Sequence, residues 1–330
     1  MKFLVGIVIA ILVLCCGGWF AASRWADGKI ADVIEVQRQR GVEIDCADRA
    51  MGGFPFSMGV GCESITIRQP DGSQIDAGAV RSAASLTAPG EARIEIDSPF
   101  TVQSGRATLE AHWRKLEAFA DATFDGGFER VSFSSHDLTI ASGDISVILG
   151  SVSGKALRSK AYEKDRNSDG LYSQISLNDV TARLPNDISI PHFSIDMDGT
   201  LDDGYRDFVV RRLTVAEVMA DGAHGVLQSA KLEMPNDGKL VLAGPFELGA
   251  DGLLSGKVKV GIANPKAVKV WARAVSPALE QPASLLAKSV AEMGAETTLG
   301  GEEVRAIELT IDKGEVRLGF IKLLDLPALR

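Results

Sequence analysis

Most of the chain alternates apolar and polar residues in short segments, which is the pattern of β-strands with one buried face. Ser64–Arg68, Ala107–Trp113 and Val131–Ile140 are clear cases, and turns such as Asn236-Asp237-Gly238 separate them. Similar segments are Ala92–Ile96, Ile145–Leu149, Leu177–Leu184, Ile188–Met197, Phe208–Val215, Val226–Met234, Leu240–Leu248 and Gly256–Ile262. Strands at about 10-residue spacing over residues 63–262 predict a large antiparallel sheet.

Helical spacing replaces this alternation in few places. Residues 24–41 space their apolar side chains as a helix does and end in a glycine, so we expect a helical stalk. Further helices are expected over about residues 264–293, with breaks at Pro277 and Pro282. A final strand pair is expected over residues 304–320.

A large antiparallel sheet must cover its apolar face with a second sheet, with helices or with something that is not protein. Three helices give thin cover for about a dozen strands. The pattern therefore predicts a mainly β fold: a large antiparallel curled sheet, or a β-groove or sandwich, with a few helices.

The N-terminus departs from the alternation, because Phe3–Phe20 is an unbroken apolar run that Ala21 and Ala22 extend. As a helix this run is about 30 Å long, enough to cross the hydrocarbon core of a membrane. A cleaved secretory signal is the competing interpretation, but cleavage after Ala22 would put the bulky Phe20 three residues back from the cut. We expect a retained transmembrane anchor over residues 1–23, followed by an extracytoplasmic β-rich domain over residues 24–330.

Composition narrows the choice of partner. The formal net charge of −9 and the sequence pI of about 5.1 argue against binding nucleic acid or docking on anionic lipid by charge. Any contact with lipid would therefore be apolar.

Two of the four cysteines, Cys15 and Cys16, lie in the apolar run, which leaves Cys46 and Cys62. In an oxidising compartment this pair predicts one disulfide; two unrelated buried thiols are the alternative. Between them, Gly53-Phe54-Pro55-Phe56 forms a glycine-proline turn. We expect a hairpin over residues 42–62, joined across its base by the disulfide.

These features resemble a bacterial family, domain of unknown function 2125. The resemblance rests on the anchor, on Gly53-Phe54-Pro55-Phe56 followed by Cys62, and on Leu242–Pro245 running into Asp251–Gly256. It also includes Gly314–Gly319 and Leu326-Pro327. The family implies no activity and no site residues.

The anchor with a β-rich domain also resembles the AsmA-like envelope proteins. That resemblance implies a curled sheet with an apolar groove for acyl chains, although this chain is too short to bridge the envelope alone. Together, the two resemblances predict a single-pass protein of the bacterial inner membrane, held by Phe3–Ala22, with its C-terminal domain in the periplasm.

Two motifs suggest chemistry. Phe193–Leu201 matches a haloacid-dehalogenase signature in which Asp196 would attack phosphorus and Asp198 would act as acid and base. That fold needs the motif after a parallel strand, whereas the neighbouring pattern is antiparallel. Asp165–Gly170 resembles the start of a calcium loop, but Ser176 occupies the twelfth position, where a carboxylate is needed.

The four histidines, His112, His136, His192 and His224, are scattered singly. We therefore assign no catalytic residue, metal or cofactor. The leading hypothesis is a non-enzymatic envelope protein that binds or transfers phospholipid or another apolar ligand. The alternatives are a scaffold with a filled β core and, remotely, a phosphatase using Asp196.

Overall fold

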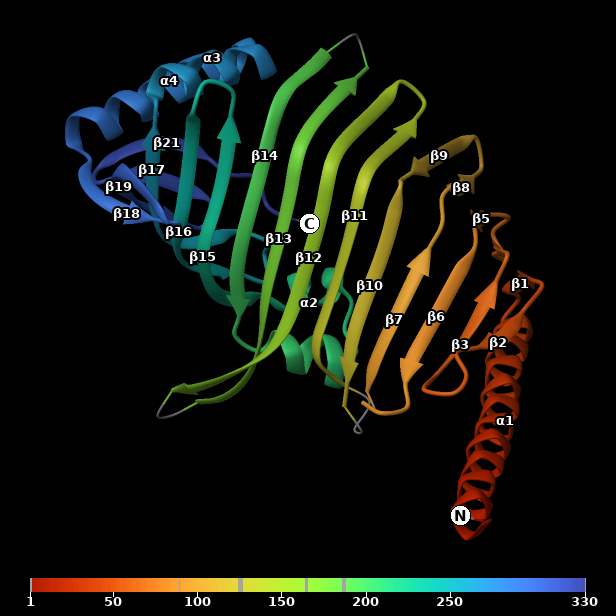
Figure 1. The fold of residues 1–330 in the computed structure, drawn as a ribbon. Coiled ribbons are helices and arrows are strands. Elements are labelled where there is room, and N and C mark those ends of the chain that lie inside the picture. Colours follow the sequence, from red (N-terminus) through yellow and green to blue (C-terminus); the bar gives the residue numbers. More distant parts are fainter. Residues whose placement is uncertain (1, 89, 124–126, 164–165, 186–187, 330) are drawn as a thin grey trace. The chain divides into compact units, whose positions relative to one another are not determined.

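A computed structural model gives the fold of the chain (Figure 1) and describes residues 2–88, 90–123, 127–163, 166–185 and 188–329, without the side chains of residues 2–16, 33 and 160–168. All 21 strands of the described chain belong to one antiparallel sheet. The mainly β prediction is therefore confirmed. The chain divides into an N-terminal unit, Met1–Gly126 with Phe133–Gly143, and a C-terminal unit, Gly127–Ser132 with Asp144–Arg330.

The N-terminal unit begins with a single helix, α1 (Lys2–Gln39), which ends in a turn at Gly41, where φ is 82°. No helix in the described part of the chain is both long and apolar enough to cross a membrane. The anchor predicted at Phe3–Ala22 falls largely on residues 3–16, whose side chains lie outside the described set.

The strands of the N-terminal unit, with β11 shared between the two units, form two ladders, β2–β3–β6–β7–β10 and β1–β4–β5–β8–β9–β11. Consecutive pairs such as β3 and β4 are halves of one long strand, interrupted between Cys62 and Ser64. Two of these interruptions lie side by side, because Trp113 Nε1 donates to the Ile96 carbonyl at 2.7 Å; Arg114 N donates to the His136 carbonyl of the continuous strand β11 at 3.0 Å. The bounds are β1 (Glu43–Ala47), β2 (Ala50–Gly52), β3 (Ser57–Cys62), β4 (Ser64–Arg68), β5 (Gln74–Ala77), β6 (Val80–Ser85), β7 (Glu91–Ile96), β8 (Phe100–Ser104), β9 (Ala107–His112), β10 (Lys115–Ala122) and β11 (Phe128–Ser142).

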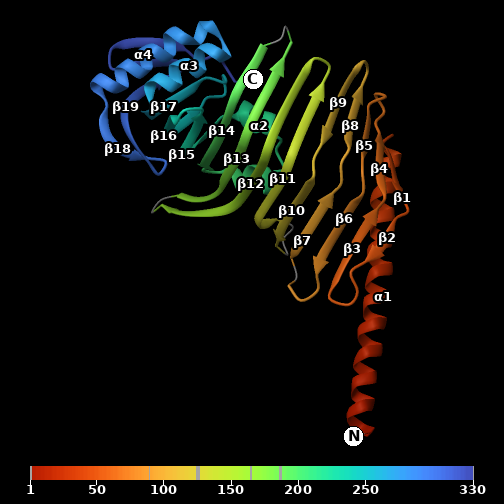
Figure 2. The same ribbon diagram turned by 45° about the horizontal axis from the view of Figure 1, so that its top comes forward.

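The C-terminal unit is a meander in which β12 to β17 pair in sequence and β17 then pairs with β19, which also pairs with β18 and β20. Helices α3 (Pro265–Val275) and α4 (Pro277–Met293) lie on one face of these strands (Figures 1 and 2). The strands are β12 (Ile145–Glu163), β13 (Arg166–Leu184), β14 (Ile188–Leu201), β15 (Ala223–Met234), β16 (Gly238–Leu248), β17 (Leu254–Ala263), β18 (Ala295–Leu299), β19 (Glu302–Asp312), β20 (Glu315–Leu318) and β21 (Ile321–Asp325).

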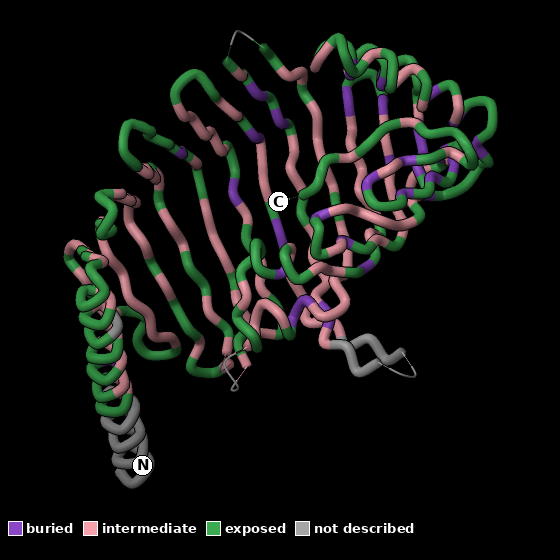
Figure 3. Tube along the Cα trace, turned by 180° about the vertical axis from the view of Figure 1, so that it is seen from behind, coloured by how far each residue is buried: buried purple, intermediate pink, exposed green. Residues whose placement is uncertain are grey.

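The main core of the C-terminal unit lies where these helices meet the sheet. Val260 and Ile307, register partners on β17 and β19, pack with Val268 of α3 and Val290 of α4. Figure 3 shows buried residues on the strands near the two helices. Each buried valine or isoleucine stabilises the fold by about 1.5–3 kcal/mol, so this core holds the helices on the sheet.

Two local predictions were wrong. Phe208–Val215 is not a strand but a π-helical turn, η1 (Arg206–Val210), leading into the short helix α2 (Val215–Asp221). A capping box explains the helix, because the Thr214 side chain accepts from the Glu217 amide while Glu217 Oε2 accepts from the Thr214 amide at 2.7 Å. Pro282 does not break α4 but lies inside it, where it removes one backbone hydrogen bond of the helix.

A close approach between β3 and β6 depends on glycine. A Cβ added to Gly59 would overlap the carbonyl oxygen of Ser82, whereas one added to Gly61 would meet Val80 O at 3.8 Å. We expect Gly59→Ala to lower the free energy of unfolding by about 1–3 kcal/mol, since the two strands must move apart. Urea unfolding measures the loss, and Gly61→Ala is the matched control; equal losses in both variants would contradict this account.

Candidate functional site: an apolar cavity beneath two helices

Local sequence fixes where the helix pair begins. Pro265 occupies the first turn of α3, and the Asn264 side chain accepts from the Ala267 amide at 3.5 Å. Asn264 Nδ2 also donates to the carbonyl of Asn236 at 2.6 Å, which ties the start of α3 to the β15–β16 turn. The apolar side of α3 therefore faces the sheet, with Ala267, Val268 and Ala272 buried.

An apolar cavity of about 250 Å³ lies between these helices and the sheet. It is lined by Leu232, Met234, Leu240, Val268, Trp271, Ala272, Leu279, Pro282, Ala283, Leu285, Leu286, Leu309, Val316, Leu323 and Leu324. The indole Nε1 of Trp271 donates to the Pro191 carbonyl at 3.3 Å, and the ring packs edge-on against Phe193, with centroids 5.8 Å apart. The cavity thus suits a ligand that needs no hydrogen bonds.

The rim of the cavity is also apolar. Leu279, Leu285 and Leu324 line it and are exposed to solvent. Next to Leu279, Glu280 lies 3.8 Å from Lys269 Nζ and 3.5 Å from Arg273 Nε. The exposed part of the lining is therefore formed by leucines, and the Glu280 ion pairs lie outside the lining.

The apolar face of the sheet continues past the helices. Leu232 and Leu240, which line the cavity, are register partners, and Leu232 also pairs with Ile195. Two residues along β14 from Ile195, Met197 pairs with Ile175, and both are exposed. Cross-strand partners lie about 4.5–5.5 Å apart, so a strip of apolar side chains leads from the cavity onto uncovered sheet.

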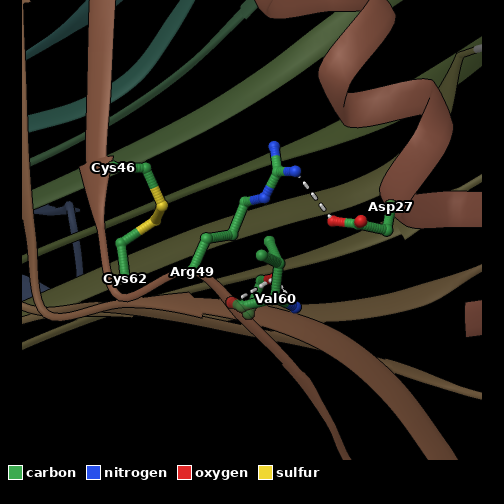
Figure 4. Close-up of a disulfide and its surroundings, with 6 residues drawn as sticks. Asp27, Cys46, Arg49, Val60 and Cys62 are labelled. Carbon is green, nitrogen blue, oxygen red and sulfur yellow. Dashed lines mark hydrogen bonds and ion pairs between the residues drawn. A yellow bond between two sulfur atoms is a disulfide. The ribbon is translucent and has the colours of Figure 1, made fainter. Parts of the chain in front are cut away.

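The predicted disulfide is confirmed: Cys46 and Cys62 are bonded, with Cα atoms 5.4 Å apart (Figure 4). The hairpin is longer than predicted, because Ser64–Arg68 pairs back onto Glu43–Ala47. The bond therefore lies partway along the hairpin rather than at its base. Gly53, Phe54, Pro55 and Phe56 form the turn between β2 and β3, with a cis Phe54–Pro55 peptide. They belong to the N-terminal unit, whereas the cavity belongs to the C-terminal one.

The haloacid-dehalogenase motif Phe193–Leu201 does not lie after a parallel strand, which is the position that its phosphoryl-transfer chemistry needs. Asp196 is in the middle of β14, which pairs antiparallel with β13 and β15, and its carboxylate is 3.8 Å from Lys231 Nζ. Asp198 lies near Tyr172, whose pKa is raised by burial and then by this carboxylate. A haloacid-dehalogenase nucleophile instead stands at the end of a parallel strand.

The other candidate ligands are dispersed. Asp165 of the calcium-like segment lies outside the described residues, and Arg158 binds both carboxylate oxygens of Asp169, at 2.8 and 2.7 Å. His192 Nε2 is 2.9 Å from Asp179, and His224 Nε2 is 3.5 Å from Asp202. In the described part of the chain, no group of three or more acidic, histidine or cysteine side chains could hold a metal ion.

A charge network lies on the other face of the β15–β16 hairpin. Glu302 accepts from Lys239 Nζ at 2.8 Å and from Lys231 Nζ at 3.4 Å. The hydrogen bond from Lys239 is the main cause that lowers the pKa of Glu302, whereas the hydrogen bond to Glu233 is the main cause that raises the pKa of Lys231. The network therefore favours the ionised form of Glu302.

This lowered pKa gives a pH-dependent stability. A carboxylate with a depressed folded-state pKa stabilises the fold above its unfolded pKa, about 4.3, and loses that contribution as the pH falls through the folded pKa. We expect Glu302→Gln to cost up to about 1 kcal/mol at pH 7, with the difference from the wild type shrinking below about pH 4.3. Urea midpoints at both pH values measure it, with the exposed neighbour substitution Glu303→Gln as control. A difference that stays constant with pH would contradict the assignment.

Comparisons with known proteins place the chain in a family. No curated protein and no solved structure matches it. A family model described as an uncharacterized protein conserved in bacteria, DUF2125, matches residues 19–327. This match spans the disulfide hairpin, the meander and the two helices over the cavity, so the chain belongs to the DUF2125 family of bacterial proteins.

Proposed function

We propose that this protein is a membrane-anchored envelope protein that binds one acyl chain of a lipid in the cavity beneath α3 and α4, without catalysis. The cavity carries the proposal, because its lining is apolar and exposed leucines stand at its rim. A hydrocarbon chain needs no polar partner, whereas a polar ligand would lose its hydrogen bonds to water on entering.

The size of the cavity favours a chain over a whole lipid. About 250 Å³ exceeds the cavity of about 150 Å³ that holds one benzene, and it falls below the range of about 300–1,000 Å³ for drug-sized ligands. A segment of acyl chain would fit, with the headgroup outside near Glu280 and its cations. Each buried methylene favours binding by about 0.8 kcal/mol before entropic costs.

The apolar strip through Ile195, Ile175 and Met197 supports transfer as well as storage. These side chains continue the face that lines the cavity, and Ile175 and Met197 are exposed. An acyl chain longer than the cavity could lie along them. The same strip is the observation that favours the second candidate, a scaffold that binds a partner protein through this surface.

The anchor and the compartment belong to the same proposal. Phe3–Ala22 has the length and composition of a membrane span, and the Cys46–Cys62 disulfide is the kind of bond that persists in an oxidising compartment. We place the protein in the bacterial inner membrane with its β domain in the periplasm.

Lipid analysis of the full chain tests the proposal. The protein purified in mild detergent is washed and extracted, and the extract is quantified by mass spectrometry against the protein. We expect close to one lipid per chain, and a titration with a fluorescent fatty acid should saturate at the same ratio. Absence of bound lipid together with no saturable binding would overturn the proposal, and a stoichiometric protein in its place would favour the scaffold.

A further inference from the structure

One side of α1 packs against the disulfide hairpin. Trp19, Ser23, Asp27 and Ile30 are half-buried or buried, at the three- and four-residue spacing of one helix face, whereas Phe20 is exposed. The buried stripe faces β1 and β3, the elements that α1 contacts. The hairpin is therefore fixed to a defined side of the helix.

Two contacts fix the position of the hairpin along the axis of α1. At one end, Arg49 is 3.1 Å from Asp27 (Figure 4). At the other, Trp19 Nε1 donates to the Ser57 carbonyl at 3.0 Å, and its ring meets Phe54 edge-on, with centroids 5.5 Å apart. The helix rises about 12 Å between Trp19 and Asp27, and a strand spans a similar distance, about 13 Å, from Arg49 to Gly53. The chain from Arg49 to Gly53 therefore follows the direction of α1 back toward the N-terminus.

The turn at the end of this hairpin is rigid. Gly53 has φ of 99°, and a Cβ there would lie 2.6 Å from Ser57 Oγ, so a side chain is excluded. The Gly53 carbonyl accepts from the Ser57 amide at 2.9 Å and from its hydroxyl at 2.8 Å. The two phenylalanines of the turn are thus held in place rather than carried on a loose loop.

Four large apolar side chains are exposed around this point: Phe20 at 56%, Phe54 at 52%, Phe56 at 71% and Leu86 at 45%. Leu86 N donates to the Phe56 carbonyl at 2.9 Å, which joins the β6–β7 turn to the group. The Arg24 guanidinium lies 4.9 Å from the centre of the Phe20 ring. We call Phe20, Phe54, Phe56 and Leu86 the apolar edge.

We propose that the apolar edge is a membrane-docking surface that inserts into the interfacial layer of the same bilayer that α1 enters. This inference rests on the anchor in the proposed function. The contact between Trp19 and the turn places the turn beside residue 19, near the end of the apolar run Phe3–Ala22. That run matches a hydrocarbon core of about 30 Å, so its end lies where aromatic rings gather at membrane surfaces.

The edge has a structural role in this position. A single helix can rotate about its own axis and leaves the domain it carries free to turn. A second insertion point on a rigid turn fixes which side of the N-terminal unit faces the bilayer. Arg24, about one turn beyond Phe20, would place its charge among the headgroups while its guanidinium stacks on the ring.

Depth-dependent fluorescence quenching tests this surface in the full chain. In a background with Cys15→Ser and Cys16→Ser, single Phe56→Cys, Leu86→Cys and Val36→Cys variants carry a nitrobenzoxadiazole label. Val36 is the matched control, because it is exposed on α1 about 24 Å along the helix from Phe20. The labelled proteins are reconstituted in phosphatidylethanolamine–phosphatidylglycerol vesicles containing doxyl-labelled lipid.

We expect at least threefold stronger quenching, with blue-shifted emission, at positions 56 and 86 than at position 36. If the chain floats with the vesicles but all three labels behave alike, the docking surface is refuted while the anchor stands. If the chain does not float with vesicles, the anchor and the docking surface both fail. Lipid bound in the cavity is measured separately and is unaffected by either result.

Discussion

Ala283→Trp is expected to reduce co-purified lipid at least tenfold while leaving the fold intact. Ala283 lines the cavity from α4, and an indole there would occupy space that we assign to the acyl chain. Filling an apolar cavity commonly stabilises a protein rather than unfolding it. Lipid per protein by mass spectrometry, with the thermal midpoint of the lipid-stripped protein, measures both effects.

Val270→Trp is the matched control, because Val270 is exposed on α3 and is not part of the cavity lining. It adds the same indole to the helix pair without entering the cavity, so bound lipid should remain at the wild-type level. Equal lipid in the Ala283 and wild-type proteins, with both folded, would remove the cavity as the binding site. Equal loss in both tryptophan variants would point to the helix surface instead.

Removing the disulfide by Cys46→Ser together with Cys62→Ser is expected to cost about 3 kcal/mol of unfolding free energy, the loop-closure value for a loop of this length. The cysteines are 16 residues apart. The paired substitution avoids leaving a free thiol. Urea unfolding under non-reducing conditions measures the loss.

The double variant Cys15→Ser with Cys16→Ser is the comparison, since it removes two thiols from the chain without touching the bond. If removing Cys46 and Cys62 lowers the free energy of unfolding by less than about 1 kcal/mol, strand pairing and α1 already hold the hairpin without the disulfide. Loss of the Trp19 contacts in the variant that lacks Cys46 and Cys62, detected by indole fluorescence, would show that the disulfide also positions the turn.

The strands were the most predictable part of the fold because alternation reports burial directly. Val226–Met234 and Leu240–Leu248 fall within β15 and β16 almost unchanged. The disulfide was predictable from the cysteine count and the expected oxidising compartment alone. The haloacid-dehalogenase match shows that a sequence motif alone does not identify a catalytic site. The residues around Asp196 match the motif, but they lie inside an antiparallel strand.

The cavity could not be predicted, because its lining comes from residues between 232 and 324 that are brought together only by the packing of two helices on the sheet. The amphipathic pattern of α3 predicts burial, not a gap left beneath it. Pro282 also misled the prediction of helix bounds, because it suggested a break inside α4. Residues Ala283, Leu285 and Leu286, which follow it in that helix, line the cavity. A signal was present in the three leucines of α4, all of which line the cavity.

The packing of α1 beside β1 also protects the chain from other copies of itself. In the described sheet β1 pairs with β4, so it is a border strand whose second row of amide and carbonyl groups has no strand to bond. Such borders recruit strands from neighbouring molecules and seed aggregation unless something covers them. Helix α1 contacts β1, so the element that we propose as the membrane tether also makes self-association through this border sterically harder.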